Sequence, residues 1–366
     1  MHMPLGFSPV DEFHLWGMLA LTLQQPNPEM HFAATPHFIL RELGCIDSNT
    51  RRGGKNYRLF RDSIDRIAVT SYRNDSFYDP KRKIHDRYVF GFLKYRAPQD
   101  LRSGRLWHFS WDPIFFEICS AIGGRLRFDL EIYRSLDPAS RRLFLLLHKI
   151  FHRRRTSPVF SVRELMTNVL GYSDSLNNGE RNQKLRQIAR RLHTANVIEF
   201  HPNDIEIEGG RYQIQFHRGP HFDDLREGRK SAATCKSPLA DALRSIGFEK
   251  ADAERICSRY KPSLLSEWID ITIAYEERNG PGVFRRSRQA YLVDGLKNVA
   301  AGKRTAPDWW QETRRREERQ LENKHEQTTL RKLQSQLSGA SMSEDARAET
   351  TTGHPTRIAD ILTSKI

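Results

Sequence analysis

The feature that most constrains the fold is an order of predicted elements that occurs twice within residues 1–220. In each copy, three helical patterns precede a pair of short strands, although the two copies share few residue identities. Helices with one apolar stripe must bury that stripe against other helices or against a sheet. The sequence therefore predicts a mainly α fold with small β-wings, made of two similar units.

The first copy covers residues 1–123. Apolar residues recur at helical intervals over 9–26 and 53–67, and Thr35 is a candidate N-cap for a helix with Pro36 at its first position. Two extended segments follow at 67–73 and 86–96, and the basic stretch DPKRKIH between them suits a hairpin loop. We expect an N-terminal unit of three helices and a hairpin.

The second copy covers residues 124–220. A strong helix is predicted over 138–151, and Ser161 with Glu164 three residues later predicts a capping box in front of another. A third helix, rich in Arg, Lys and Gln, follows over 181–194. After it, apolar and polar residues alternate around HPND and GG turns, which is typical of a small wing of strands.

The remainder of the chain divides by composition. Residues 221–238 are polar and contain Gly and Ser, which predicts a linker, and 239–302 carry four helical patterns, which predict a helical module. From 303 to 366 the composition turns to Arg, Glu, Gln, Lys, Ser and Thr. Such a segment is expected to be a charged and flexible tail.

The third helix of the second copy has an unusual polar face. At about 100° per residue, Leu185, Ile188, Ala189 and Leu192 gather on one side and predict the buried face. The other side displays Gln183, Lys184, Arg186, Gln187, Arg190 and Arg191. A solvated face usually mixes charge signs, because Glu–Lys pairs stabilise it. The one-signed face favours contact with DNA, and the alternative is an ordinary solvated helix.

The first copy has a related but less uniform set of cations. The third helix presents Lys55, Arg58, Arg61 and Arg66 among Asp62 and Asp65, preceded by Arg51 and Arg52. The hairpin loop adds Lys81, Arg82 and Lys83. These residues are candidate DNA contacts, although the mixed signs also fit a solvated surface.

Charge and cysteine content limit the class of protein. The net charge is +14 and the isoelectric point is near 9.8, which points to a polyanion or an anionic surface as partner. The strongest apolar run, 143–147, is far shorter than a membrane span, and the N-terminus lacks the pattern of a signal peptide. The four cysteines are scattered without a CxxC pair. We therefore expect a cytoplasmic protein with reduced thiols.

Catalytic motifs are missing from the sequence. His148 and His152 have the spacing of a zinc motif but lack its glutamate, and RRGGKN lacks the glycine and hydroxyl residue of a phosphate loop. The sequence contains neither a His-x-His pair nor a Gly-x-Ser-x-Gly elbow. We predict a protein that is not an enzyme and needs no cofactor and no metal.

The chain resembles the plasmid replication initiators often called replication initiator protein A. The segments that carry the resemblance are RGGKNYRLFRDSIDRIAVTSY at 52–72, WHFSWDPIFFEIC at 107–119 and LRFDLEIYRSLDPASRRLFLLLHKIF at 126–151. Its strongest part consists of Asp129, Tyr133, Leu136, Pro138, Arg141, Arg142 and Leu143. Residues 239–302 resemble the helical C-terminal appendage of related initiators, whereas the tail lies outside the match.

The resemblance implies tandem winged-helix domains that bind directly repeated sites of double-stranded DNA at a plasmid origin. It also implies recruitment of host replication proteins, such as a helicase or helicase loader, and a homodimer that represses its own promoter. Two alternatives remain: a tandem winged-helix transcriptional regulator, and a basic helical scaffold that binds RNA or an acidic protein.

Overall fold

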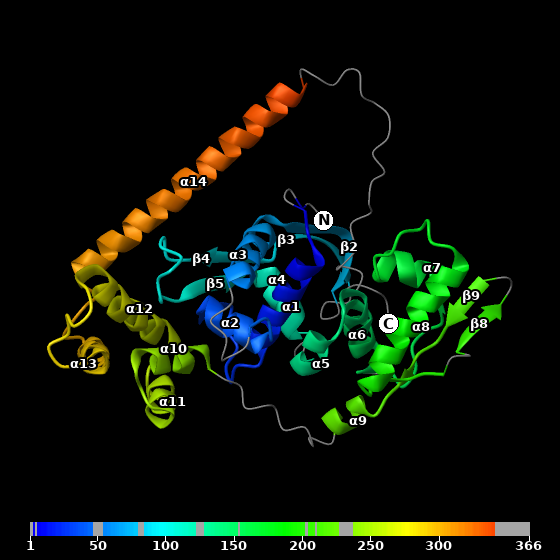
Figure 1. Cartoon of the computed structure of the whole chain (residues 1–366), viewed down its shortest axis with the longest axis horizontal. Helices are drawn as coiled ribbons and strands as arrows, with labels where there is room; N and C mark the ends of the chain where they lie inside the picture. The colour runs from blue at the N-terminus through cyan, green and yellow to red at the C-terminus, as the bar shows by residue number, and fades with distance from the viewer. Residues whose placement is uncertain are drawn as a thin grey trace.

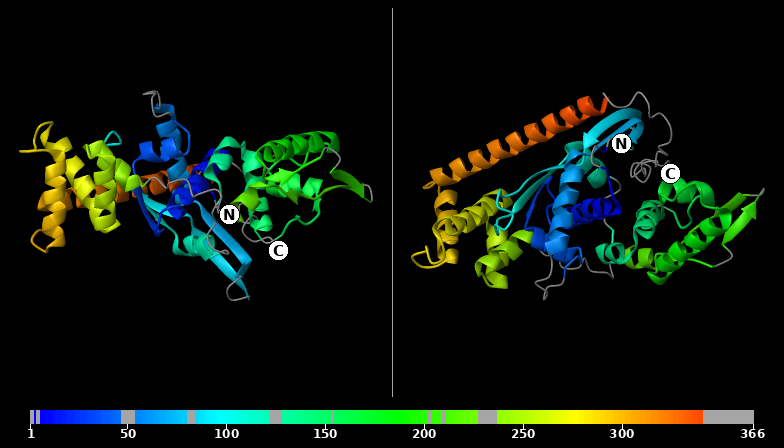
Figure 2. Two further views of the ribbon diagram at one scale, coloured as in Figure 1. Left: turned by 90° about the horizontal axis from the view of Figure 1, so that it is seen from below. Right: turned by 45° about the horizontal axis from the view of Figure 1, so that its top comes forward.

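The computed structural model describes residues 3, 6–46, 54–79, 84–121, 128–152, 154–201, 204–208, 211–226 and 237–340. Within these ranges the fold is mainly α with small antiparallel sheets, as predicted. In Figures 1 and 2 the N-terminal elements occupy the centre of the molecule, and the second unit and the C-terminal helices lie at opposite ends.

Helices and a small sheet form the first unit. Its elements are α1 (Pro9–Leu23), β1 (His31–Ala34), α2 (Pro36–Glu42), α3 (Gly54–Val69), β2 (Ser71–Asp79), β3 (Ile84–Gly91), β4 (Leu93–Arg96), β5 (Trp107–Trp111) and α4 (Pro113–Ala121). The Thr35 side chain accepts a hydrogen bond from the Phe38 N–H at 3.1 Å, so the predicted cap of α2 is confirmed. A three-stranded antiparallel sheet has the order β1–β5–β4.

The predicted hairpin is present, but it is separate from that sheet. β2 and β3 pair from Ser71 opposite Gly91 onward, and together they form a two-stranded ribbon. The extended segment expected at 86–96 is interrupted at Phe92, because β4 leaves the ribbon to pair with β5 instead. The sequence prediction had missed β1 and its pairing with β5.

The second unit repeats the arrangement. Its elements are α5 (Leu130–Ser135), α6 (Pro138–Phe151), β6 (Phe160–Ser161), α7 (Val162–Glu164), the π-helix η1 (Leu165–Val169), α8 (Asn178–Thr194), β7 (Ile198–Glu199), β8 (Ile205–Glu208), β9 (Arg211–Ile214), β10 (His217–Arg218) and α9 (His221–Arg226). The sheet order β6–β9–β8 places the first strand beside the last, as β1–β5–β4 does. The repeated order of elements in the sequence therefore has a counterpart in strand pairing.

One continuous core joins the two units. It extends along the chain from Phe13 to Phe222. At the junction the rings of Phe13 and Tyr133 stack with centroids 5.8 Å apart, and the Arg142 Nε donates to the Glu12 carboxylate at 2.7 Å. Both charged groups are buried, so replacing either one would leave the other as an uncompensated charge inside the junction.

Five helices and a second core make up the C-terminal module. They are α10 (Pro238–Ile246), α11 (Lys250–Arg259), α12 (Pro262–Asn279), α13 (Arg288–Ala300) and α14 (Asp308–Ala340). Trp268 fills the centre, and a Cβ at Gly295 would lie 2.1 Å from its ring, so only glycine fits at this position of α13. α14 begins inside the segment expected to be a flexible tail, and its Trp310 is buried in this core. Further along, α14 projects away from the body (Figure 1).

Candidate nucleic-acid interface

α8 owes its position to a cap and to a buried stripe. The Asn177 side-chain oxygen accepts from the Glu180 N–H at 2.9 Å, and the Glu180 carboxylate accepts from the Asn177 N–H at 3.0 Å. This reciprocal capping box satisfies two backbone donors at the start of the helix. The predicted apolar stripe, Leu185, Ile188, Ala189 and Leu192, is buried. The polar face is thereby turned outward.

The six polar residues predicted on that face differ in their surroundings. Gln183, Gln187, Arg190 and Arg191 are exposed, whereas Lys184 and Arg186 are half-buried. The Lys184 ammonium lies 5.5 Å from the centroid of the Tyr172 ring, and Arg191 forms an ion pair with Asp137 at 2.9 Å. Within the described residues, the side chains of Gln183, Gln187 and Arg190 make no hydrogen bond or ion pair. These three are available to a ligand without breaking an internal contact.

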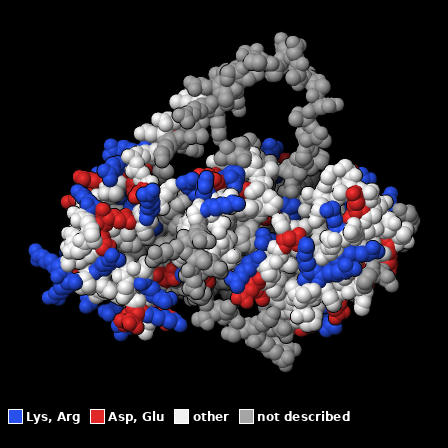
Figure 3. Space-filling view, viewed as in Figure 1, with Lys and Arg blue, Asp and Glu red and all other residues white. Residues whose placement is uncertain are grey.

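Cations are visible along this surface. In Figure 3, Lys and Arg side chains gather where Figure 1 places α8. Beside the C-terminal half of the helix lies a groove of about 450 Å³, lined by Ser135, Leu136, Arg190, Arg191, Thr194 and Ala195. Two of its lining side chains are guanidinium groups, so the groove favours an anion.

The connection before α8 is held by an acidic residue. Asp174 accepts from the exposed Arg163 at 2.5 Å and from the buried Arg181 at 3.1 Å. The hydrogen bond from Arg163 lowers the pKa of the Asp174 carboxyl. Two cations on one carboxylate fix the turn between η1 and α8, so the angle at which α8 is presented depends on it.

The π-helix η1 is tied to the first unit. Arg142 donates through its Nη1 to the Leu170 carbonyl at 2.9 Å, while its Nε holds Glu12. Leu170 ends η1, and π-helical turns are frequent at functional positions. A single buried arginine thus connects α1, α6 and the segment that precedes α8.

The cations predicted on the first unit also differ in whether they contact an acidic residue of the same chain. Lys55 and Arg58 are exposed on α3, and Arg61 lies 3.5 Å from Asp62. Arg66 donates to both carboxylate oxygens of the buried Asp11, at 2.9 and 2.7 Å, so its guanidinium has an internal structural role. Arg51, Arg52, Lys81, Arg82 and Lys83 lie outside the described residues.

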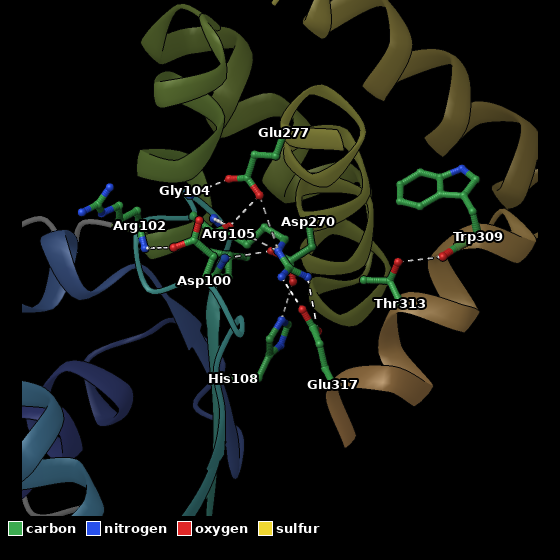
Figure 4. Close-up of polar contacts among 12 residues, drawn as sticks. Asp100, Arg102, Gly104, Arg105, His108, Asp270, Glu277, Trp309, Thr313 and Glu317 are labelled. Carbon is green, nitrogen blue, oxygen red and sulfur yellow. Dashed lines mark hydrogen bonds and ion pairs between the residues drawn. The ribbon is translucent and has the colours of Figure 1, made fainter. Parts of the chain in front are cut away.

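The loop between β4 and β5 was not among the predicted sites. By strand order it corresponds to the β8–β9 turn of the second unit, and it is covered by the C-terminal module. Figure 4 shows three carboxylates meeting it. Glu277 accepts from the Ser103 hydroxyl at 2.8 Å and from the Gly104 N–H at 2.9 Å. These partners are more than 170 residues apart along the chain, and no local signal in the sequence identifies them.

The other two carboxylates bind deeper in the same interface. Asp270 accepts from the Leu106 N–H at 2.8 Å and contacts the His108 Nε2 at 2.7 Å. Glu317 of α14 pairs with Arg105 at 2.5 Å, and that guanidinium also lies over the Trp310 ring. This loop of the first unit is therefore occupied by the protein itself.

Two further kinds of feature are not found in the described residues. No group of three or more His, Cys, Asp or Glu side chains there is arranged to hold a metal ion. Each helix in the described ranges lacks the continuous apolar length that a membrane-spanning segment requires.

Comparison with known proteins gives limited information. No family model matches the chain, and no curated protein matches it. Two solved structures, both of domains 2 and 3 of RctB, are similar, each at 18% identity, with TM-scores of 0.39 and 0.42. The similarity covers 60% and 59% of this chain and 85% of each RctB chain. At this level of similarity neither structure assigns a function.

Proposed function

We propose that this chain is a plasmid replication initiator that binds repeated origin DNA through two winged-helix units. The order α6, β6, α7 with η1, α8, β8, β9 is the order of elements in a winged helix-turn-helix, with α8 in the place of the recognition helix. The observation that carries the proposal is the outward face of α8, where two glutamines and Arg190 project without internal partners.

These side chains have the chemistry that base reading requires. Glutamine pairs with the N6 and N7 edge of adenine, and arginine pairs with the O6 and N7 edge of guanine, both in the major groove. Lys184, Arg186 and Arg191 belong to the same polar face of α8 and would contact phosphates. In the first unit, Lys55 and Arg58 of α3 would contact an adjacent stretch of the same duplex.

The same fold would also serve a transcriptional regulator. An initiator and a regulator with this fold would bind DNA in the same way, so the arrangement of their DNA sites distinguishes them. Directly repeated sites favour initiation, because an initiator assembles several copies side by side. A single palindrome favours regulation by a dimer.

The test is a footprint of the purified full-length chain over the DNA that flanks its own coding region. We expect protection of several direct repeats. Replacing both Gln183 and Gln187 by alanine should abolish the protection of all of them. Protection of one palindrome would replace the initiator assignment with a regulator. Uniform, sequence-independent protection would contradict base reading and favour a basic scaffold.

The proposed protein acts without chemistry of its own, and recruits host replication proteins after binding.

A further inference from the structure

A cluster of aromatic rings lies on the C-terminal module, apart from the carboxylates that hold the β4–β5 loop. Tyr275 and Tyr291 stack with centroids 5.1 Å apart and planes 10° apart. Phe284 packs against both, at 5.6 and 5.3 Å, and Trp309 lies 6.0 Å from Tyr275. All four side chains are half-buried, whereas the neighbouring Trp310 is fully buried. The cluster therefore keeps aromatic surface in contact with solvent.

Arginines surround these rings. The Arg278 guanidinium lies 5.6 Å from the centroid of Trp309, and that of Arg304 lies 5.9 Å from Tyr291. Arg285 and Arg286 directly follow Phe284 and are exposed, and within the described residues neither forms an ion pair. Figure 3 shows Lys and Arg side chains at the edge of the molecule where Figure 1 places α13.

Nearby acidic residues do not neutralise this charge. Glu276 is paired with Arg288 at 2.6 Å, and Asp294 lies 3.6 Å from Arg304. Glu277 is directed to the β4–β5 loop, where it binds Ser103 and Gly104. Arg278, Arg285 and Arg286 therefore give the aromatic cluster a local excess of positive charge.

Partly exposed rings beside unpaired arginines match the chemistry of unpaired nucleobases on a phosphate chain. Aromatic side chains stack on bases that a duplex would keep inside its own stack, and arginines neutralise the phosphates between them. We infer that the cluster formed by Tyr275, Phe284, Tyr291, Trp309, Arg278, Arg285 and Arg286 binds single-stranded nucleic acid. The site lies at the opposite end of the molecule from α8 (Figures 1 and 2), and the inference does not depend on duplex binding there.

The test is binding of labelled oligothymidylate and oligouridylate to the full-length chain, followed by fluorescence anisotropy over a series of salt concentrations. The double variant Arg285→Ala/Arg286→Ala removes two phosphate contacts. It should reduce the slope of log affinity against log salt by about 1.4, at about 0.7 per phosphate of a single strand. Phe284→Leu should lower the affinity about tenfold and leave that slope unchanged, because it removes a stacking surface and no charge.

The matched control is Lys250→Ala/Arg255→Ala, which removes two charges from α11, a helix of the same module that carries none of the seven cluster residues. It should bind single strands as the unmodified chain does. An equal loss in this control, or no loss in the Arg285/Arg286 variant, would overturn the inference. Displacement of the oligonucleotide by polyglutamate at equal charge concentration would also overturn it, because the site would then recognise anions in general. A preference for thymidylate or for uridylate supports the inference and identifies the natural strand as DNA or RNA.

Duplex binding separates this inference from the proposed function. Both variants should bind duplex DNA with unchanged affinity. If duplex binding by α8 fails altogether, the single-strand result still stands. The Arg285 and Arg286 side chains make no internal ion pair among the described residues, so their double variant also remains informative if Phe284→Leu does not fold.

Discussion

At the scale of single residues, the cations of the candidate interface differ in whether a carboxylate of the same chain already holds them. Arg66 and Arg191 would have to leave Asp11 and Asp137 before reaching a phosphate. Arg190 has no such partner within the described residues, and its neighbour Thr194 donates only to the Arg190 backbone carbonyl at 3.0 Å. All three residues are arginines, but Arg66 and Arg191 must break an ion pair before they can bind a phosphate.

This difference predicts unequal effects of two neighbouring substitutions. Arg190→Ala should weaken binding to a specific duplex by about 1–3 kcal/mol, because it removes a free base-reading or phosphate-binding group. Arg191→Ala should weaken it by less than about 1 kcal/mol, since that guanidinium is partly neutralised by Asp137. Titration of a labelled duplex with each variant measures both values. A larger loss for Arg191→Ala would mean that its ion pair opens when DNA binds.

A buried histidine makes the stability of the first unit depend on pH. Burial lowers the pKa of His14 to about 4, from an ordinary value of 6.5, and its Nδ1 has no hydrogen-bond partner in the described structure. The folded state therefore holds the ring neutral, and the unfolded state takes up a proton first. The contribution of the neutral His14 ring to the free energy of unfolding is fully present above about pH 6.5 and is lost as the pH falls toward 4.

We expect the free energy of unfolding to fall by about 2 kcal/mol between pH 7 and pH 5 on account of His14. Urea denaturation at the two pH values measures this change. His14→Phe, which keeps an aromatic ring beside Phe60, should lose about that much of the pH dependence. An undiminished pH dependence in the variant would assign the effect to other groups.

At the scale of elements, the sequence predicted the features that depend on residues close together along the chain. The N-caps at Thr35 and Ser161, the apolar stripe of α8 and the β2–β3 hairpin all follow from residues a few positions apart. Of the capping box predicted at Ser161, the structure shows only the Ser161 side chain accepting from the Glu164 N–H. Pairings between distant segments were missed, because no local pattern encodes them. β1 has only four residues and pairs with β5 through His31 opposite Ser110. The contacts of Asp11 with Arg66 and of Asp137 with Arg191 were missed for the same reason, so the exposed face of α8 was predicted but its free members were not.

The residues that carry the family resemblance have a structural explanation. Pro138 begins α6, Arg141 lies 4.1 Å from the ring of Phe13, and Arg142 holds Glu12. All of them pack α5 and α6 against α1. These residues therefore maintain the junction between the two units.

The carboxylates on the β4–β5 loop give a prediction for the attachment of the C-terminal module. Asp270→Ala should destabilise the module by about 2–4 kcal/mol, because the Leu106 N–H is left buried without an acceptor and His108 loses its partner. Asp270→Asn keeps an oxygen for the Leu106 N–H and should lose about half as much. Thermal unfolding, together with limited proteolysis between the first unit and α12, measures both. Equal stability of the alanine variant would show that this contact does not hold the module.

At the scale of the whole molecule, the sequence carries a net charge of +14. A duplex bound along α8 and α3 would neutralise part of it and release counterions from the DNA. If about 6–10 phosphates are engaged, the slope of log affinity against log salt should lie between roughly −5 and −9. Filter binding at several salt concentrations measures it. A slope near zero would contradict an interface built on phosphate contacts.

The shared core between the first two units has a consequence for the geometry of any DNA site they read together. Units joined by a flexible tether tolerate extra base pairs between their contacts, because the tether extends. Here Glu12, Arg142 and the stacked rings of Phe13 and Tyr133 leave no such freedom. A site lengthened by five base pairs, about half a helical turn, would turn one contact to the far side of the duplex, and a full turn would move it out of reach. On the proposed function, the spacing within each repeat would thus be dictated by the interior of the protein.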